Sequence, residues 1–330
     1  MTVTRDPAMQ LSGGRRRTMI VVAGLGVVAY LIAALTTDAD SLKAALAALG
    51  LTGSLLVLGA SLLNYGLRFR RWSLYITQLG HRPPLGRHLL YYLSGFAFTV
   101  SPAKIGEAVR ALYLREHGVP YADSMAALSV ERLLDLLAVA LLACLFVLHA
   151  PAYWPVLAGA LLLTAVLIMV IGRPAASRLL DRLAAARRGR IGAGIASSIA
   201  DLLRASRRLL SPGLLARGLL LGVIAWGAEG IGLYWICSGL DLAIAPSTAI
   251  GIYAIAVLAG AAAFFMPGGL GAMEMMMPAL LLAQGVPLPT AVLAMLLCRL
   301  TTLWFAVLLG LLAAALLEAN PRFTATTSTP

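Results

Sequence analysis

Long apolar stretches dominate the chain, and short segments between them carry most of its charged residues. About six stretches are interpreted as membrane-spanning helices, since roughly 20 apolar residues are needed to cross a bilayer. They run over residues 18–35, 46–66, 124–148, 154–171, 214–237 and 290–317. The pattern predicts an all-α, polytopic integral membrane protein.

Two further apolar regions are each interrupted by a proline. Residues 86–101 and 103–117 flank Pro102, and residues 247–266 and 269–284 flank Pro267. Most of these pieces are short for a spanning helix. We therefore predict that each region is a re-entrant hairpin, whose two arms enter and leave the membrane on the same side.

The two broken regions also match one another along the chain. Corresponding residues are 165 or 167 positions apart: Pro102 and Pro267, Gly106 and Gly271, Asn64 and Glu229, Gly118-Val119-Pro120 and Gly285-Val286-Pro287, and Arg132 and Arg299. The shared order indicates a duplicated unit of span, hairpin and span. The two units cover residues of about 46–149 and about 214–317.

Composition and charge agree with a membrane protein and predict its orientation. Hydrophobic residues make up 60% of the chain and charged residues 12%, whereas soluble domains carry roughly 25% charged residues. This excludes an ordinary soluble enzyme, and it excludes a nucleic-acid-binding chain despite the net charge of +12. Arginine-rich segments mark cytoplasmic loops. Residues 173–217 hold ten Arg against two Asp.

Under this assignment both termini are cytoplasmic, and the two units have opposite orientations. Such an inverted repeat is typical of transporters, which bind their ligand near the membrane midplane between broken helices. Residues 1–17 are then a cytoplasmic segment, 18–318 a single membrane domain and 319–330 a disordered tail. The basic segment 173–213 contains Ile191, Ile195 and Ile199 at helical spacing, which predicts an amphipathic helix lying against the cytoplasmic headgroups. Arg68, Arg70 and Arg71 are predicted at the cytoplasmic end of the second span.

Ionisable residues at membrane depth supply the candidate chemistry. A charge at the centre of a membrane helix costs roughly 2.5–3.5 kcal/mol, so such residues must face one another or water. The glycines after Pro267 add a half-helix N-terminus that could bind an anion. The predicted substrate-binding residues are Lys104, Glu107, Arg110, Glu131, Arg132, Asp135, Glu229, Gly268, Gly269, Glu274 and Arg299. A network of salt bridges that only fixes helix packing is the alternative. No catalytic or metal-binding motif is recognisable in the sequence, and no cofactor is predicted.

These residues resemble the membrane region of the lysylphosphatidylglycerol synthase family, which is the flippase-like domain of bacterial multiple-peptide-resistance proteins. The resemblance covers roughly residues 15 to 318, and Ala103 stands where the family is expected to have glycine. The matching residues are Asn64 with Arg68 to Trp72, Ser101-Pro102-Ala103-Lys104-Ile105-Gly106-Glu107 with Arg110, Glu131-Arg132 with Asp135, Pro267-Gly268-Gly269-Leu270-Gly271 with Glu274, and Arg299.

The soluble synthase domain is not expected in this chain. The resemblance therefore implies lipid translocation rather than aminoacyl-lipid synthesis. The expected function is that of a lipid flippase or lipid-transport protein in the bacterial inner membrane, with a membrane lipid as its substrate. Two alternatives stay open: a membrane-embedded enzyme acting on a lipid-linked substrate, and a scaffold for a lipid pathway such as hopanoid biosynthesis. Homo-oligomers and lipid-biosynthesis enzymes are possible partners, and no nucleic-acid partner is expected.

Overall fold

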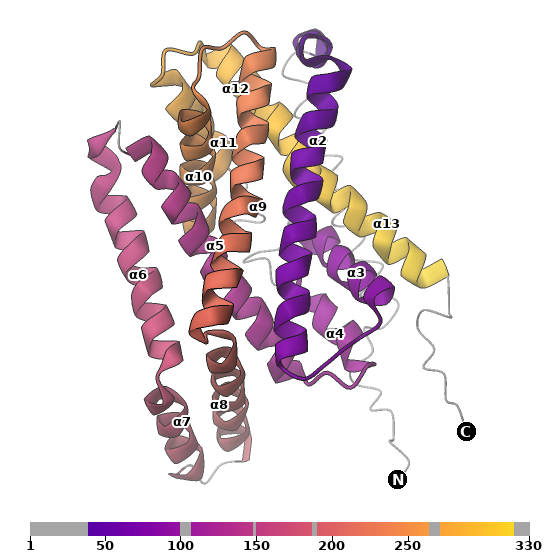
Figure 1. Cartoon of the computed structure of the whole chain (residues 1–330), viewed down its shortest axis with the longest axis vertical. Coiled ribbons are helices and arrows are strands. Elements are labelled where there is room, and N and C mark those ends of the chain that lie inside the picture. The colour runs from indigo at the N-terminus through magenta and orange to yellow at the C-terminus, as the bar shows by residue number, and fades with distance from the viewer. Residues whose placement is uncertain (1–38, 100–106, 148–149, 187–189, 264–270, 320–330) are drawn as a thin grey trace.

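The computed structural model describes residues 39–99, 107–147, 150–186, 190–263 and 271–319. Every regular element in these ranges is a helix, which confirms the predicted all-α class (Figure 1). The α-helices are α2 (Ala39–Gln78), α3 (Leu85–Ser94), α4 (Val109–Arg115), α5 (Tyr121–Val147), α6 (Trp154–Gly172), α7 (Pro174–Ala186), α8 (Arg190–Leu209), α9 (Pro212–Gly239), α10 (Pro246–Ala262), α11 (Ala272–Leu282), α12 (Leu288–Arg299) and α13 (Phe305–Ala319). Short 3₁₀ turns cover Gly95–Phe98 and Pro151–Tyr153, and a π-helical turn, Leu300–Trp304, joins α12 to α13.

Among the residues that the structure describes, three helices are long and apolar enough to cross a membrane: Asp40–Gln78, Pro212–Gly239 and Leu288–Ala319. They include the predicted spans 46–66, 214–237 and 290–317. The predicted span 124–148 is the 27-residue helix α5, which carries three charged residues in its middle. The predicted span 154–171 is present as α6, with a shorter apolar stretch, Leu157–Gly172. The predicted span 18–35 lies outside the described residues.

Large apolar side chains are exposed along these helices. Leu51, Leu55, Leu162, Leu220 and Leu308 are all more than half exposed. A contiguous apolar surface of this kind marks contact with lipid rather than water. The chain is therefore an integral membrane protein with its apolar surface turned outward.

Helix α2 differs from the prediction at its C-terminal end. The prediction that Arg68 and Arg71 follow the span as part of a cytoplasmic loop is wrong. The helix continues to Gln78, and both arginine side chains are buried inside the protein. Carboxylates from other helices surround the two arginines and compensate their charge. The helix can therefore continue through these residues inside the protein. At the other end, Gly50 has a positive φ and breaks the helix.

The two regions broken by proline each form a pair of short helices. In Figure 1, α3 and α4 lie in the lower part of the view, while α10 and α11 lie in the upper part. The tips that contain Pro102 and Pro267 lie outside the described residues. The arms agree with the predicted pieces, because α3 and the following turn cover 85–98 and α10 covers 246–262.

The same backbone turn follows both pairs of short helices. Gly118 and Gly285 adopt positive φ angles of 75° and 83°. After each glycine, the valine N–H reaches back to a leucine carbonyl, from Val119 to Leu114 and from Val286 to Leu281. A glycine at this left-handed position is a common helix stop. Helices α5 and α12 then begin after the matching Pro120 and Pro287.

The amphipathic helix expected near residues 191–208 is present as α8, Arg190–Leu209. Ala196, Ala200 and Leu209 are buried, whereas Ile199 is 44% exposed. Helix α8 packs against α7 and α5. In Figure 1 the α7–α8 pair extends beyond the lower end of the bundle. Small alanines face the neighbouring helices because they allow the helices to approach closely.

Candidate functional site

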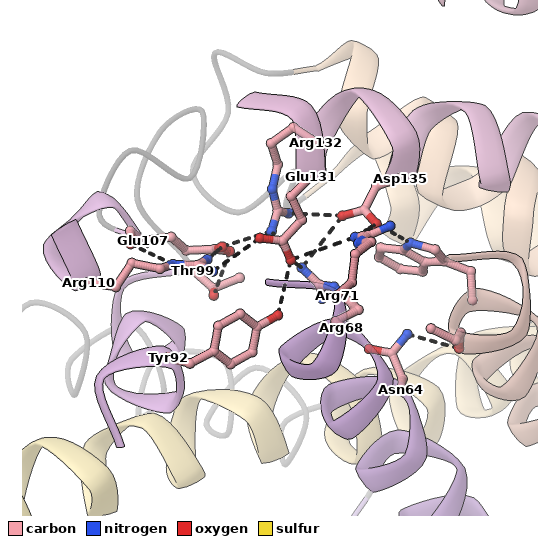
Figure 2. Close-up of polar contacts among 12 residues, drawn as sticks. Asn64, Arg68, Arg71, Tyr92, Thr99, Glu107, Arg110, Glu131, Arg132 and Asp135 are labelled. Atoms are coloured by element: carbon pink, nitrogen blue, oxygen red, sulfur yellow. Dashed lines mark hydrogen bonds and ion pairs between the residues drawn. The ribbon is translucent and has the colours of Figure 1, made fainter. Parts of the chain in front are cut away.

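The site is a network of arginines and carboxylates at the centre of the first half of the chain (Figure 2). Helix α5 supplies Glu131, Arg132 and Asp135 from a single turn of helix. Helix α2 supplies Arg68 and Arg71, which are three residues apart and therefore share a face. Each of these side chains lies within 4 Å of an oppositely charged group. The carboxylates of α5 thus join α2 to α5.

Asp135 is the point where three helices meet. Its Oδ1 atom accepts a hydrogen bond from Nη2 of Arg71 at 2.5 Å and another from Nε1 of Trp226 on α9 at 2.9 Å. Gly222 of α9 makes this possible, since a Cβ atom there would lie 2.8 Å from Nη1 of Arg71. The Arg71 side chain is completely buried. It therefore holds α2, α5 and α9 together and is not available to a ligand.

Arg110 is likewise fully buried and engaged by protein groups. Its guanidinium carbon lies 4.6 Å from the ring centroids of both Trp72 and Tyr92, which are neighbouring rings 6.2 Å apart. It donates hydrogen bonds to Glu131 at 3.2 Å and to Glu107 at 2.5 Å. Because its hydrogen bonds go to two carboxylates and to the Glu107 carbonyl, Arg110 holds these carboxylates in place.

Arg132 differs from these two arginines because it is partly accessible. Its Nη2 atom donates a hydrogen bond to Oε2 of Glu107 at 3.0 Å, and its side chain is 27% exposed. Glu107 also accepts a hydrogen bond from Thr99 at 3.2 Å. Arg132 is thus held by protein carboxylates on one side and open on the other.

A second, smaller cluster lies in the second half of the chain. Arg299, at the end of α12, donates from Nε to Oε1 of Glu274 at 2.6 Å. The other oxygen of Glu274 accepts the backbone N–H of Gly271 at 2.7 Å, so this carboxylate caps the N-terminus of α11. Close by, Tyr253 donates its hydroxyl to Glu229. An anionic ligand at this helix end would have to displace Glu274.

A cavity of about 300 Å³ connects the two clusters. Its charged lining comes from both halves of the chain: Arg68, Glu107, Arg132, Asp135, Glu229 and Arg299. The rest of its wall is largely aromatic and aliphatic, with Trp226, Tyr253 and Val257 among the lining residues. A mostly apolar pocket with a few converging polar groups is the usual form of a small-ligand site.

The structure brings most of the predicted site residues together. Glu107, Arg132, Asp135, Glu229 and Arg299 line the cavity, whereas Arg110 and Glu131 are buried beside it and Glu274 reaches it through Arg299. Lys104, Gly268 and Gly269 lie outside the described residues.

The sequence analysis missed Arg68 and Arg71 as members of the network because a run of arginines resembles a cytoplasmic anchor. Their spacing of three residues within a continuing helix was the available signal. Tyr92, Trp226 and Tyr253 were also missed. Nothing in an apolar helix distinguishes an aromatic residue that donates a hydrogen bond from one that only packs.

Comparisons with known proteins agree with the resemblance. A family model described as the lysylphosphatidylglycerol synthase TM region matches residues 21–310. The glycosyltransferase AglD of Haloferax volcanii is 32% identical over 137 residues, which make up 38% of this chain and 21% of that protein. The chain thus spans about a fifth of the length of this relative. The description of the family model points to a membrane protein of lipid-related function.

Proposed function

The chain belongs to the lysylphosphatidylglycerol synthase transmembrane-region family, and from this premise we propose that it moves a lipid with a polar headgroup between the two leaflets of the membrane. The headgroup would enter the cavity between the two halves of the chain while the acyl chains stay in the bilayer. The proposed location is the bacterial inner membrane, with both termini in the cytoplasm.

One observation carries this proposal: a single cavity is lined by charged residues from both halves of the chain. Charges inside a membrane protein are costly and usually mark the path of a substrate. Arg68, Arg132 and Arg299 offer guanidinium groups to the anionic part of a headgroup. The carboxylates beside them hold these arginines in place and keep the protein's own charge in the cavity close to neutral.

The two arginine–glutamate pairs suggest how access to the cavity alternates. Arg132 pairs with Glu107 beside the first hairpin, and Arg299 pairs with Glu274 beside the second. If the hairpins enter from opposite sides, as the proposed inverted repeat requires, each pair lies towards a different leaflet. A headgroup that competes for Arg132 would loosen the first hairpin, and one that competes for Arg299 would loosen the second.

Reconstitution into liposomes tests the proposal directly. The purified protein is placed in vesicles that contain a trace of phospholipid labelled with a fluorophore on its acyl chain, and dithionite is added to bleach the outer leaflet. Lipid movement makes the label of the inner leaflet accessible as well. We expect this with the natural chain and with Arg207→Gln, whose side chain is exposed on α8. Vesicles with Arg132→Gln should behave like protein-free vesicles.

The similarity to AglD favours a second candidate function. AglD is called a glycosyltransferase, so chemistry on a lipid-linked substrate is the alternative. The same vesicles separate the two candidates, because an enzyme would convert a labelled lipid-linked substrate without moving phospholipid. A protein that does neither would fit a scaffold for lipid-biosynthesis enzymes.

A further inference from the structure

We propose that the cavity recognises a net-neutral zwitterionic headgroup, in which a phosphate is joined to a primary ammonium as in a phosphatidylethanolamine-type lipid. This inference names the substrate class of the proposed transporter and rests on that function. It depends on the balance of charge in the cavity and on hydrogen-bonding capacity that the protein itself leaves unused.

The charged groups that line the cavity balance one another within the described part of the chain. Three arginines, Arg68, Arg132 and Arg299, and three carboxylates, Glu107, Asp135 and Glu229, are among the lining residues. A ligand with a net charge loses its hydration when it enters such a site. A site whose own charges balance has no surplus opposite charge to offset that cost. A zwitterion keeps the site neutral, while each of its two ends still meets an opposite charge.

One ion pair in the cavity is left open. Oδ2 of Asp135 lies 3.6 Å from Nη2 of Arg68, beyond hydrogen-bonding distance, and it lies equally far from Nη1 of Arg132. Neither Oδ2 of Asp135 nor Nη2 of Arg68 has a hydrogen-bond partner among the described residues, and both of these residues are more than nine-tenths buried. The other oxygen of Asp135 is fixed by Arg71 and Trp226. The carboxylate is therefore held in place with one acceptor unused.

The unused groups match the two ends of the headgroup. Arg132 and Arg299 also keep a nitrogen, Nε and Nη2 respectively, without a partner in the described structure. A phosphate carries only acceptors and suits these guanidinium donors. An ammonium carries three donors and no acceptor, and therefore suits the free oxygen of Asp135. Small side-chain rotations would let a headgroup insert between Arg68 and Asp135.

The wall of the cavity favours a lipid over a soluble molecule. Val139, Val257 and Leu303 line it beside the charges. A soluble phosphoethanolamine would leave this apolar surface uncovered, whereas the glycerol and first acyl carbons of a lipid would cover it.

Three acyl-labelled lipids in the dithionite assay test the inference. Phosphatidylethanolamine has N–H donors and no net charge, phosphatidylcholine is zwitterionic without N–H donors, and phosphatidylglycerol has hydroxyl donors and a net negative charge. We expect phosphatidylethanolamine to move on the order of ten times faster than the other two. Equal rates for phosphatidylcholine or phosphatidylglycerol overturn the inference and leave the transport function standing.

If no lipid moves, the transport function fails, and binding then decides the inference separately. Native mass spectrometry of the purified protein with short-chain forms of the same lipids should show selective retention of phosphatidylethanolamine. Equal retention of all three, or none, overturns it. Soluble O-phosphoethanolamine is the competitor, and competition as strong as that of the lipid would show that the site takes the free headgroup instead.

Variants on α2 link the result to the open ion pair. Arg68→Gln should lose the preference for phosphatidylethanolamine, while Arg70→Gln, on the exposed side of the same helix, should keep it. If Arg68→Gln does not fold, Arg68→Lys preserves the charge but removes the planar donor pair, and it should also lower the preference. An unchanged preference in a folded Arg68 variant contradicts the assignment.

Discussion

Arg299 donates a hydrogen bond from Nε to Oε1 of Glu274 across 2.6 Å, and this joins the end of α12 to the first turn of α11. The first half of the chain contains the corresponding pair, in which Arg132 donates to Glu107 across 3.0 Å. In both cases the partners are 25 residues apart. The same ion pair therefore stands at matching positions of the two proposed repeats.

The first prediction concerns these paired arginines. Replacing Arg132 or Arg299 by Gln should abolish lipid movement while the protein still inserts into the membrane. Each change removes a cation from the cavity and leaves a carboxylate behind. The dithionite assay measures the loss, and Arg207→Gln is the matched surface control. If all three variants move lipid at the same rate, the cavity is not the transport site.

The second prediction concerns Arg71, which supports the site without lining the cavity. Arg71→Gln should lower the free energy of unfolding by about 3–5 kcal/mol, because it leaves buried carboxylates with too little positive charge. Thermal unfolding in detergent is the measurement. Arg70→Gln should change the melting temperature little, since that side chain is exposed. Similar melting temperatures for both variants would contradict the role given to Arg71.

A third prediction tests the contact between α2 and α9. Gly222→Ala places a methyl group 2.8 Å from Nη1 of Arg71 and 3.2 Å from Cβ of Ala138. Since Arg71 is fully buried and cannot swing away, stability should fall by about 1–3 kcal/mol. Gly227→Ala on the same helix is the control, because its nearest neighbour would be 3.9 Å away. Equal unfolding temperatures for the two variants would argue against the close packing.

The fourth prediction is orientation. In a variant that lacks Cys144, Cys237 and Cys298, a cysteine at Asp241 should react with an impermeant thiol reagent from outside the cell. A cysteine at Arg182 should react only after the membrane is opened, because the arginine-rich segment stays in the cytoplasm. Labelling of the Arg182 position from outside would reverse the proposed topology.

The fifth prediction concerns the two hairpins. Spin labels at Ala108 and Ala262, which flank the two proline breaks, should lie at similar depths in the hydrocarbon core. Two ordinary helical hairpins would place them near opposite membrane surfaces instead. Accessibility to oxygen, compared with that to a water-soluble nickel complex, reports the depth of each label. Labels that lie near opposite membrane surfaces would contradict the re-entrant arrangement.

The sequence by itself determined the helical class, the identity of several spans and most charged members of the site. Hydropathy is a property of each segment, so the helices that meet lipid can be recognised without knowledge of their neighbours. A charged residue inside an apolar stretch can also be recognised from the sequence alone, because its burial is costly wherever its partner lies. The residues recognised in this way include Glu107, Arg132, Asp135, Glu229 and Arg299.

The sequence does not show which arginines are bound to other protein groups and which line the cavity, because this depends on the tertiary structure. Arg68, Arg71 and Arg110 have the same chemistry, yet Arg110 is hydrogen-bonded to Glu107 and Glu131 and Arg71 is fixed to Asp135, while Arg68 lines the cavity. These differences arise from contacts between residues as far apart as 64 and 91 positions. Local spacing gives the face of a helix on which a side chain lies, but the helix that covers this face is set by packing of the whole chain.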